Sequence, residues 1–581
     1  MKKLTLLILV LLLSLTGCQK PNKVVDDNKE FDAFLYSEFQ ALLNDDLISQ
    51  HYQVYNPETY QLKRPETASL GEVGYDSYQE QLEKTDALIG KFKEFKYESL
   101  SSHQQVDYDV IMWNLNATKE LNKYPDFDFV FSPMNGYQSN IITNFMEFRI
   151  ENKQDIEDYL WLLKDVSRLF KDGIAFTKQQ AEKGYFLQDY TLNETIDLID
   201  KFTDAKDNQL IVSFKDKVAF VNDVSEEEKN AFLQENEDIV YNQIIPVFKE
   251  TKEALNGLRG SSSVKDQGLA AYPNGKEYYA TLFKYKASDD ISVDDAFKAL
   301  NDYILSWLQQ YIVILGGAEG AVDEASNYTL PYKGVDEILA YLEEHYPKIV
   351  HPLPSIDYKI SYLDPSITNP SISAYYLQAP IDNTTLNVIR VNGENSSSDF
   401  DLFVTLAHEG LPGHLYQNMN FIQTKANPYR LSNSFIGYSE GWAMISEFFM
   451  IETLDFEYPE TATILKSDIG LNYAIGALVD IMVNYYGYDV AQIEEHFSTT
   501  FGFNLGTETF QTIREGAISD PASIIPYGYG LMKMDNYYKE ALKKYGDKFS
   551  ILEFTEVLMK NGERPFVFVD KDIAQYMKGK K

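Results

Sequence analysis

Cysteine is almost missing from this sequence of 581 residues, in which Cys18 is the only one. A single cysteine excludes a disulfide within the chain, and a chain of this length buries enough apolar surface to fold without one. Long apolar runs are also missing after the N-terminal segment, because no later stretch reaches the roughly 20 residues that a transmembrane helix needs. Stability is therefore expected from large apolar cores. Any attachment to a membrane must depend on something other than a transmembrane helix.

Positive charge is scarce as well. The chain has 52 Lys and Arg against 88 Asp and Glu, which gives a formal net charge of −36. So acidic a chain repels nucleic-acid phosphates and anionic lipid surfaces, which excludes both as general partners. The composition suits a soluble body held off a membrane by a tether.

The first residues have the pattern of a bacterial export signal. Met1-Lys2-Lys3 precedes an apolar run from Leu4 to Leu15, which is too short to span a bilayer. Leu15-Thr16-Gly17-Cys18 then resembles a lipobox, in which cleavage before the cysteine leaves a new N-terminal residue that carries lipid. The sequence thus predicts a signal peptide over 1–17, a lipid anchor and linker over 18–30, and extracytoplasmic attachment to the cell membrane. Each buried CH₂ of such an anchor contributes about 0.8 kcal/mol.

From Phe31 onward, apolar residues recur at the three-to-four spacing of amphipathic helices. Similar runs occupy residues 156–170, 196–202 and 232–255. The Gly- and Ser-rich segment 257–275 separates helices of like character, so we expect one helical domain over 31–581.

Two short segments have a different pattern. Residues 372–377 and 386–392 alternate or are rich in β-branched and aromatic side chains, and a turn is predicted over 380–383. A predicted helix over 403–417 follows them. The chain should therefore be mainly α, with a small β-sheet just before this helix.

His408, Glu409 and His414 lie in an arrangement close to a zinc-protease pattern. In the usual form, H-E-x-x-H, two histidines four residues apart share one helix face and bind one Zn²⁺, while the Glu acts as general base. Here Pro412 occupies the second histidine position, and His414 would point about 120° away from His408 in a regular helix. Pro412 and Gly413 predict a bulge or kink that would bring His414 back toward His408.

A catalytic zinc site needs a third protein ligand, because the fourth position is left to water. Glu440 and Glu447 lie in a predicted helix over 437–449, and their spacing places both on one side of it. A carboxylate among the aromatic residues of this helix is costly to bury without a partner. The pair points to a metal or an imidazole, without deciding which carboxylate would bind the metal.

Together these segments resemble the bacterial family called domain of unknown function 885. Its signature, H-E-x-x-P-G-H-H followed by E-G-W-A-x-x-x-E, is similar to His408–His414 and Glu440–Glu447. Weaker likeness covers most of the chain from about residue 30, including Gly275–Tyr279 and Pro521–Gly530. That family resembles the helical gluzincin metallopeptidases. The resemblance implies a large helical bundle-like fold in two halves around a deep cleft, with a small β-sheet next to the motif helix.

The resemblance also implies one zinc ion held by His408, His414 and Glu440. Glu409 would be the base that takes a proton from water and passes it to the leaving amine. Glu447 would orient a ligand imidazole through its free N–H.

The resemblance also implies residues that contact the substrate. Tyr527 would donate a hydrogen bond to the oxyanion, with Tyr529 as its substitute. Gluzincins bind the substrate backbone along an edge strand beside the motif helix. By that likeness residues 388–392, with Arg390 and Asn392, would pair with the peptide.

The sequence departs from the family pattern at three places. Leu415 stands where the family has its second adjacent histidine. The pattern V-D-x-G-x-H matches at Asp480, which would support the site from behind, but its histidine position holds Asn484. Arg514, a residue suited to gripping a substrate carboxylate, has a longer spacing to Pro521 than the family pattern. No proposed ligand is lost by these changes.

The leading interpretation is a lipid-anchored zinc peptidase of short or unfolded peptides, with trimming from the C-terminus suggested by analogy alone. A non-catalytic peptide-binding lipoprotein is an alternative from another class, although a binder has no need of Glu409 beside a metal. A zinc hydrolase of another amide uses the same chemistry and stays open. The other histidines are expected to be surface or capping residues: His51, His103, His345, His351 and His496.

Overall fold

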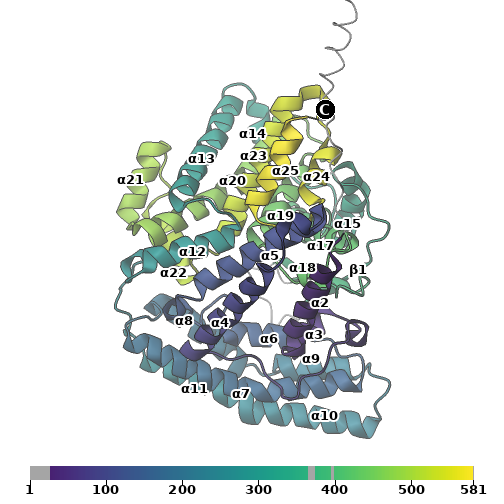
Figure 1. Ribbon diagram of the computed structural model, residues 1–581. Coiled ribbons are helices and arrows are strands. Elements are labelled where there is room, and N and C mark those ends of the chain that lie inside the picture. Colours follow the sequence, from purple (N-terminus) through teal and green to yellow (C-terminus); the bar gives the residue numbers. More distant parts are fainter. Residues whose placement is uncertain (1–26, 364–372, 394–397, 580–581) are drawn as a thin grey trace, which may run out of the picture.

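The computed structural model describes residues 27–363, 373–393 and 398–579. Helices dominate this part of the chain, and its strands form one three-stranded sheet (Figure 1). The expectation of a mainly α fold with a small β-sheet is therefore confirmed. The predicted signal peptide over 1–17 and the predicted lipidation site Cys18 lie outside the described residues.

Three groups of helices follow one another along the chain. The N-terminal group is α2 (Lys29–Asn44), α3 (Leu47–Gln53), α4 (Tyr75–Phe92) and α5 (Ser102–Leu121). The lower layer, at the bottom of Figure 1, is α6 (Tyr137–Glu147), α7 (Lys153–Glu182), α8 (Asp189–Thr203), α9 (Gln209–Val218), α10 (Glu226–Ile239) and α11 (Ile245–Gly257).

The upper layer contains the remaining helices and the sheet. It begins with α12 (Gly275–Ala287), α13 (Val293–Leu315), α14 (Glu319–Ser326) and α15 (Gly334–His345), followed by β1 (Tyr358–Tyr362), β2 (Ala374–Leu377) and β3 (Asn387–Val391). It continues with α16 (Asp399–Glu409), α17 (His414–Gln423), α18 (Pro428–Leu431), α19 (Ile436–Ile451) and α20 (Glu460–Ile481). It ends with α21 (Val490–Thr500), α22 (Thr507–Ser519), α23 (Ile525–Tyr545), α24 (Ile551–Met559) and α25 (Phe566–Met577).

Each layer encloses its own apolar cluster. In the lower layer, α7 begins where Asn152 accepts a hydrogen bond from the Asp155 N–H, and Leu163, Val166 and Phe170 lie on its buried side. The upper-layer cluster includes buried residues of α12, α13, α19, α20 and α23. The α19 side chains are buried on nearly every face, so residues of this helix are held by packing from all directions.

The sheet has the strand order β1-β3-β2, with β1 parallel and β2 antiparallel to β3. The strands predicted over 372–377 and 386–392 correspond to β2 and β3, while β1 was not predicted. Arg390 pairs with Ser361 on one side and Tyr375 on the other. The expectation that residues 388–392 bind a peptide as an edge strand is wrong, because β3 is the central strand and its backbone is already paired on both sides.

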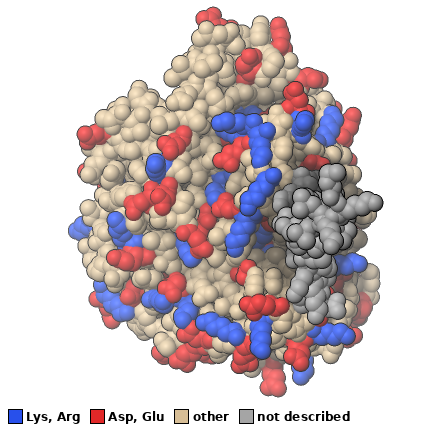
Figure 2. Space-filling model, turned by 45° about the horizontal axis from the view of Figure 1, so that its top comes forward, with Lys and Arg blue, Asp and Glu red and all other residues tan. Residues whose placement is uncertain are grey.

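The helix predicted over 403–417 is broken in two. Residues 410–413 separate α16 from α17, so the chain makes a full break where a bulge or kink was expected. The described helices include none that is long and apolar enough to cross a bilayer. On one face of the molecule, acidic and basic side chains are interspersed over the surface (Figure 2).

Candidate metal centre

His408 and Glu409 are the last two helical residues before the break. Their helix, α16, starts with a capping box in which Ser398 and Asp401 bond each other's backbone N–H groups. Phe403 and Leu406 bury one face of α16 in the upper-layer cluster. The end of the helix is thereby fixed against the core, with His408 buried and Glu409 partly exposed.

The break between α16 and α17 depends on Gly413. The Gly413 N–H donates to the Ala407 carbonyl at 3.0 Å, and a Cβ on Gly413 would lie 1.8 Å from the His408 carbonyl oxygen. Only glycine allows so close an approach. The Pro412 carbonyl accepts a hydrogen bond from Trp442 Nε1 at 2.9 Å, which ties the break to α19.

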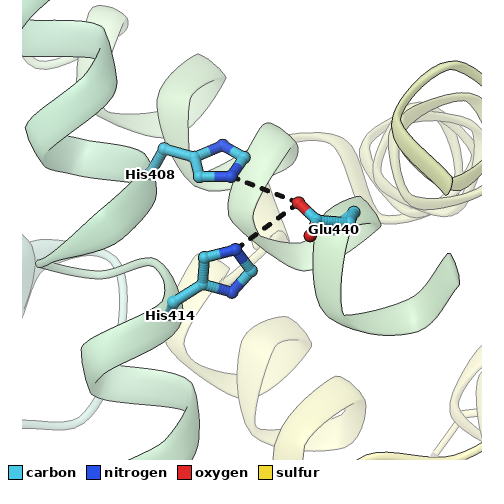
Figure 3. Close-up of side chains that lie close together, drawn as sticks. All are labelled: His408, His414 and Glu440. Atoms are coloured by element: carbon cyan, nitrogen blue, oxygen red, sulfur yellow. Dashed lines mark ion pairs between the residues drawn. The ribbon is translucent and has the colours of Figure 1, made fainter. Parts of the chain in front are cut away.

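This break brings His414 beside His408, as was predicted from Pro412 and Gly413. The two imidazole rings lie 4.8 Å apart between centroids. Glu440, on α19, faces both: its Oε2 lies 3.3 Å from His408 Nε2 and 3.4 Å from His414 Nε2 (Figure 3). One ligand atom from each of the three residues falls within 4.8 Å of the others.

The three residues fit a divalent metal ion such as zinc. Two imidazole nitrogens and a carboxylate oxygen are ordinary zinc ligands, and tetrahedral bonds of about 2.0–2.1 Å place neighbouring ligand atoms about 3.4 Å apart. The two separations from Glu440 Oε2 agree with that value. Among the described residues, the buried Glu440 Oε2 also has no hydrogen-bond partner. An orphaned carboxylate oxygen aimed at two ring nitrogens is what a metal would satisfy.

Charge within the cluster shifts the pKa values of its members. Burial opposes protonation of His408, but the nearby carboxylates of Glu440 and Glu447 raise its pKa well above the ordinary value. Burial also opposes ionisation of Glu440, yet His414 and His408 hold its pKa far below its usual range. Without a metal, the cluster is thus a set of ion pairs, and a cation would take the place of the protons.

Glu447 lies behind His408. Its Oε1 is 2.7 Å from His408 Nδ1, and it stands two helical turns after Glu440 on α19. A carboxylate at this nitrogen holds a proton on Nδ1 and leaves Nε2 for a metal. Burial raises the pKa of Glu447, although its bond to His408 opposes the rise.

Glu409 is held by the edge strand of the sheet. Its Oε2 accepts a hydrogen bond from the Tyr376 N–H at 2.9 Å. That N–H belongs to β2, whose other side pairs with β3. The proposed base is therefore in direct contact with the strand at the edge of the described sheet.

The two tyrosines proposed as oxyanion donors lie on different sides of α23. The Tyr527 ring stacks beside His408 at 6.3 Å, and burial together with the charges of Glu440 and Glu409 raises its pKa. Tyr529 is fully buried and donates to Asp289 at 2.7 Å. Residues two apart on a helix point about 200° apart, so the substitute role of Tyr529 does not agree with the fold.

Asp480 also lies apart from the proposed ligands. Its carboxylate accepts from the Tyr279 hydroxyl at 2.5 Å and from the Ala522 N–H at 3.0 Å, with Asn484 Nδ2 at 3.5 Å. These bonds join α12 and α20 to the segment before α23. The expected support of the metal ligands by Asp480 is not seen in its contacts, and this residue instead connects three parts of the upper layer.

Arg390 and Asn392 are placed away from a free strand edge. Arg390 binds Glu147 at 2.5 Å and Ser361 Oγ at 2.5 Å, and the Asn392 N–H donates to the Ser373 carbonyl at 2.8 Å. Arg390 thus connects the sheet to α6 of the lower layer.

Two positions that differ from the family pattern, and the remaining histidines, lie outside the cluster. Leu415 is fully buried in the core, and Arg514 binds Asp266. Three of the other histidines have partners elsewhere: His51 with Arg149, His345 with Tyr341 and His496 with Asn301. His103 and His351 lie 3.7 Å from Asp107 and 3.9 Å from Glu556.

Two residues near the cluster were missed by the sequence analysis. Tyr473 on α20 stacks on Tyr527 at 5.7 Å, and burial with the charges of Glu447 and Glu440 raises its pKa to about 12. Ser439 lies 3.4 Å from His414 Nδ1. Its position directly before Glu440 was the available signal, whereas nothing in the sequence connected Tyr473 to this place.

One bacterial family and several solved structures resemble this chain. A family model described as "Bacterial protein of unknown function (DUF885)" matches residues 63–573, while no curated protein matches the chain. A structure described as "the putative lipoprotein from Colwellia psychrerythraea" is 16% identical and covers 96% of this chain and 100% of its own, with a TM-score of 0.80. A structure of "a putative lipoprotein of unknown function from Shewanella oneidensis" is 14% identical and covers 94% and 99%, with a TM-score of 0.60. At these identities the likeness shows a shared fold alone.

Proposed function

The chain belongs to the bacterial DUF885 family, and we propose that it is a lipid-anchored zinc peptidase that cleaves short or unfolded peptides. The observation that carries this proposal is the meeting of His408, His414 and Glu440 around a common point. Glu409 follows His408 in the chain, and its charge acts on both imidazoles. A carboxylate of this kind, beside a metal and not among its ligands, serves as a base.

The residues of the cluster divide the chemistry of amide hydrolysis between them. A zinc ion held by His408, His414 and Glu440 would lower the pKa of a water molecule and polarise the amide carbonyl. The Glu409 carboxylate accepts a proton from the attacking water. It then returns the proton to the leaving nitrogen as the C–N bond breaks.

Tyr527 stands beside His408 with its hydroxyl protonated, since its pKa is raised. In the proposed reaction this hydroxyl donates a hydrogen bond to the developing oxyanion. Glu447 keeps the proton on His408 Nδ1 throughout. Protons therefore move only at Glu409, and the other residues hold fixed protonation states.

A peptide substrate suits the strand edge beside Glu409. The Tyr376 N–H of β2 points to Glu409, so this side of β2 faces the proposed base and not β3. An extended peptide along the edge of β2 would bring an amide bond to Glu409 by backbone pairing alone, whatever its side chains. A deep cleft between the layers would restrict such substrates to short or unfolded chains.

Attachment to a membrane is part of the proposal. It rests on Leu15-Thr16-Gly17-Cys18, and two structures of the same fold carry the description "putative lipoprotein". Palmitate labelling of cells that produce the full chain should mark the protein, and Cys18→Ala should abolish the label. An unlabelled full chain would contradict the anchor.

The enzymatic proposal is tested by metal analysis together with cleavage of a mixed peptide library. The wild-type protein should contain one zinc per chain and cleave peptides. Glu409→Gln should keep the zinc and lose at least about 100-fold in rate, because only the base is removed. Glu227→Gln, at an exposed position of the lower layer, is the matched control and should behave as wild type.

Three other results would contradict the proposal in different ways. Absence of stoichiometric metal would remove the site. Metal and peptide binding without cleavage that depends on Glu409 would identify a peptide-binding lipoprotein. Zinc-dependent hydrolysis of another amide, with peptides left intact, would reassign the substrate.

A further inference from the structure

The two histidines of the cluster have different groups behind them. His408 has a carboxylate at its Nδ1, that of Glu447 at 2.7 Å. His414 has a hydroxyl at its Nδ1, that of Ser439 at 3.4 Å. Ser439 Oγ in turn donates to Gln417 Oε1 at 3.0 Å. Behind His414 there is thus a neutral chain of two side chains, in the place that Glu447 occupies behind His408.

The direction of these hydrogen bonds follows from the available hydrogens. A serine hydroxyl has one hydrogen and two lone pairs. Because Ser439 gives its hydrogen to Gln417, its oxygen accepts from the Nδ1–H of His414. A proton on Nδ1 leaves the Nε2 lone pair of His414 free, and Nε2 is the nitrogen directed at Glu440 (Figure 3).

The positions of these residues in the fold favour a fixed arrangement. Gln417 is buried, with 2% of its surface exposed, and stands one turn after His414 on α17. Ser439 directly precedes Glu440 on α19. The Ser439–Gln417 bond therefore connects the helix that carries His414 with the helix that carries Glu440.

We propose that Ser439 and Gln417 are positioning residues that hold His414 in the tautomer and ring orientation required for metal binding. The inference rests on the proposed function, because it takes the cluster to be a metal site. Neither residue touches the substrate or the reacting atoms. Since their acceptor is neutral, His414 should be the weaker of the two histidine ligands, and Glu447 should make His408 the stronger.

Zinc affinity is the first measurement, by competition with a chromophoric chelator. Ser439→Ala and Gln417→Leu should each weaken binding about 10-fold, near the lower end of the range for residues behind a metal ligand. Glu447→Gln should weaken it about 100-fold. Ser439→Thr keeps the hydroxyl and should stay within about 3-fold of wild type. Gln417→Glu puts a carboxylate at the end of the chain and should tighten binding.

Cobalt substitution gives a second measurement that a merely structural role would not change. The visible absorption of bound cobalt(II) reports the geometry around the metal, so Ser439→Ala should change its position or intensity and Ser439→Thr should restore it. Thermal unfolding of each variant without metal separates a loss of positioning from a loss of folding.

Wild-type affinity and an unchanged cobalt spectrum in both Ser439→Ala and Gln417→Leu would overturn the inference. If Glu447→Gln were still weakened in that experiment, the proposed function would stand. A wild-type protein that binds no stoichiometric zinc would overturn both, and this result is visible before any variant is made.

Discussion

The lower and upper layers differ in how they bury charge. In the lower layer the buried charged residues are Glu147 and Asp158, and each is paired with an arginine, Arg390 and Arg64 respectively. The upper layer buries a larger set: Asp289, His408, Arg430, Glu447, Asp480, Arg514, Asp535, Glu563 and Arg564. A buried charge is costly unless it is paired or coordinates a metal.

This difference in buried charge suggests different roles for the two layers. Apolar packing with few charges makes the lower layer a support, and changes there should alter the free energy of unfolding without altering the metal site. In the upper layer two of the buried charged residues, His408 on α16 and Glu447 on α19, belong to the metal cluster. Changes at the cluster should alter metal binding or catalysis first. The expected effects below run from the largest to the smallest.

Gly413→Ala should have the largest effect. Its Cβ would lie 1.8 Å from the His408 carbonyl oxygen, so the break between α16 and α17 must change. We expect a loss of about 5 kcal/mol in unfolding free energy and no measurable zinc binding. Gly257→Ala, at the end of α11, meets nothing within 4 Å. It should be neutral or slightly stabilising. Denaturant unfolding measures the stability of the two variants, and zinc competition measures their metal affinity. Equal effects of the two variants would contradict the difference proposed between the layers.

Asp480 should make stability depend on pH. Burial raises its pKa to about 7, above the value of about 3.9 in an unfolded chain. Between these values the folded chain keeps a proton that the unfolded chain has lost. Unfolding free energy should therefore fall as pH rises from about 4 to 7, by at most about 4 kcal/mol.

Asp480→Asn should remove that fall, because an amide does not titrate. It can keep two of the three contacts: its oxygen accepts from the Ala522 N–H, and its NH₂ donates to the Tyr279 hydroxyl. Chemical unfolding at pH 4, 5.5 and 7 measures the slope. Asp197→Asn, at an exposed position of α8, is the matched control and should shift unfolding by less than about 0.5 kcal/mol at each pH. A slope that is the same in Asp480→Asn and wild type would assign the pH dependence to other groups.

Removal of a single tyrosine hydroxyl should lower activity in the upper layer but not in the lower layer, with little change in stability. Tyr527→Phe should lower kcat about 100-fold, close to 3 kcal/mol in the activation barrier, with zinc content unchanged. Tyr159→Phe removes a buried hydroxyl of the lower layer, which lies 3.5 Å from the Leu210 carbonyl. It should leave kcat unchanged and cost about 1 kcal/mol of stability. Full activity of Tyr527→Phe would contradict the proposed role of Tyr527 as the donor to the oxyanion.

A surface ion pair of the lower layer should matter least. Lys164 and Glu235 lie 2.6 Å apart with nearly half of each side chain exposed. Because solvent screens such pairs, Glu235→Gln should change unfolding free energy by less than about 0.5 kcal/mol and leave zinc affinity unchanged. A larger loss would mean that the lower layer also depends on its charges.

Much of the cluster could be predicted from the sequence. His408, Glu409 and His414 lie within one short segment, and Pro412 with Gly413 already indicated that a regular helix would not continue. Glu440 and Glu447 were predicted as a pair from their spacing on one helix. Local spacing was sufficient here because each group of residues lies on a single element or on either side of one break.

The failures concern relations between distant elements. Strand order cannot be deduced from alternation within a strand, so the central place of β3 and the outer place of β2 in the described sheet became visible only in the fold. The relation between Asp480 and Tyr279 joins α12 to α20 across the upper layer. Tyr529 was a different case, since helical periodicity alone would have placed it opposite Tyr527.

The position of Glu440 on a helix separate from the two histidines has a consequence for folding. A metal ion held at this site would cross-link α16 and α17 to α19 and so close a loop of the chain. Because the unfolded chain has no preformed site, the ion would bind the folded state and stabilise it by the free energy of binding, whereas a disulfide restricts the unfolded state. A chain whose single cysteine allows no disulfide would thus have one cross-link after all, reversible and dependent on the supply of metal.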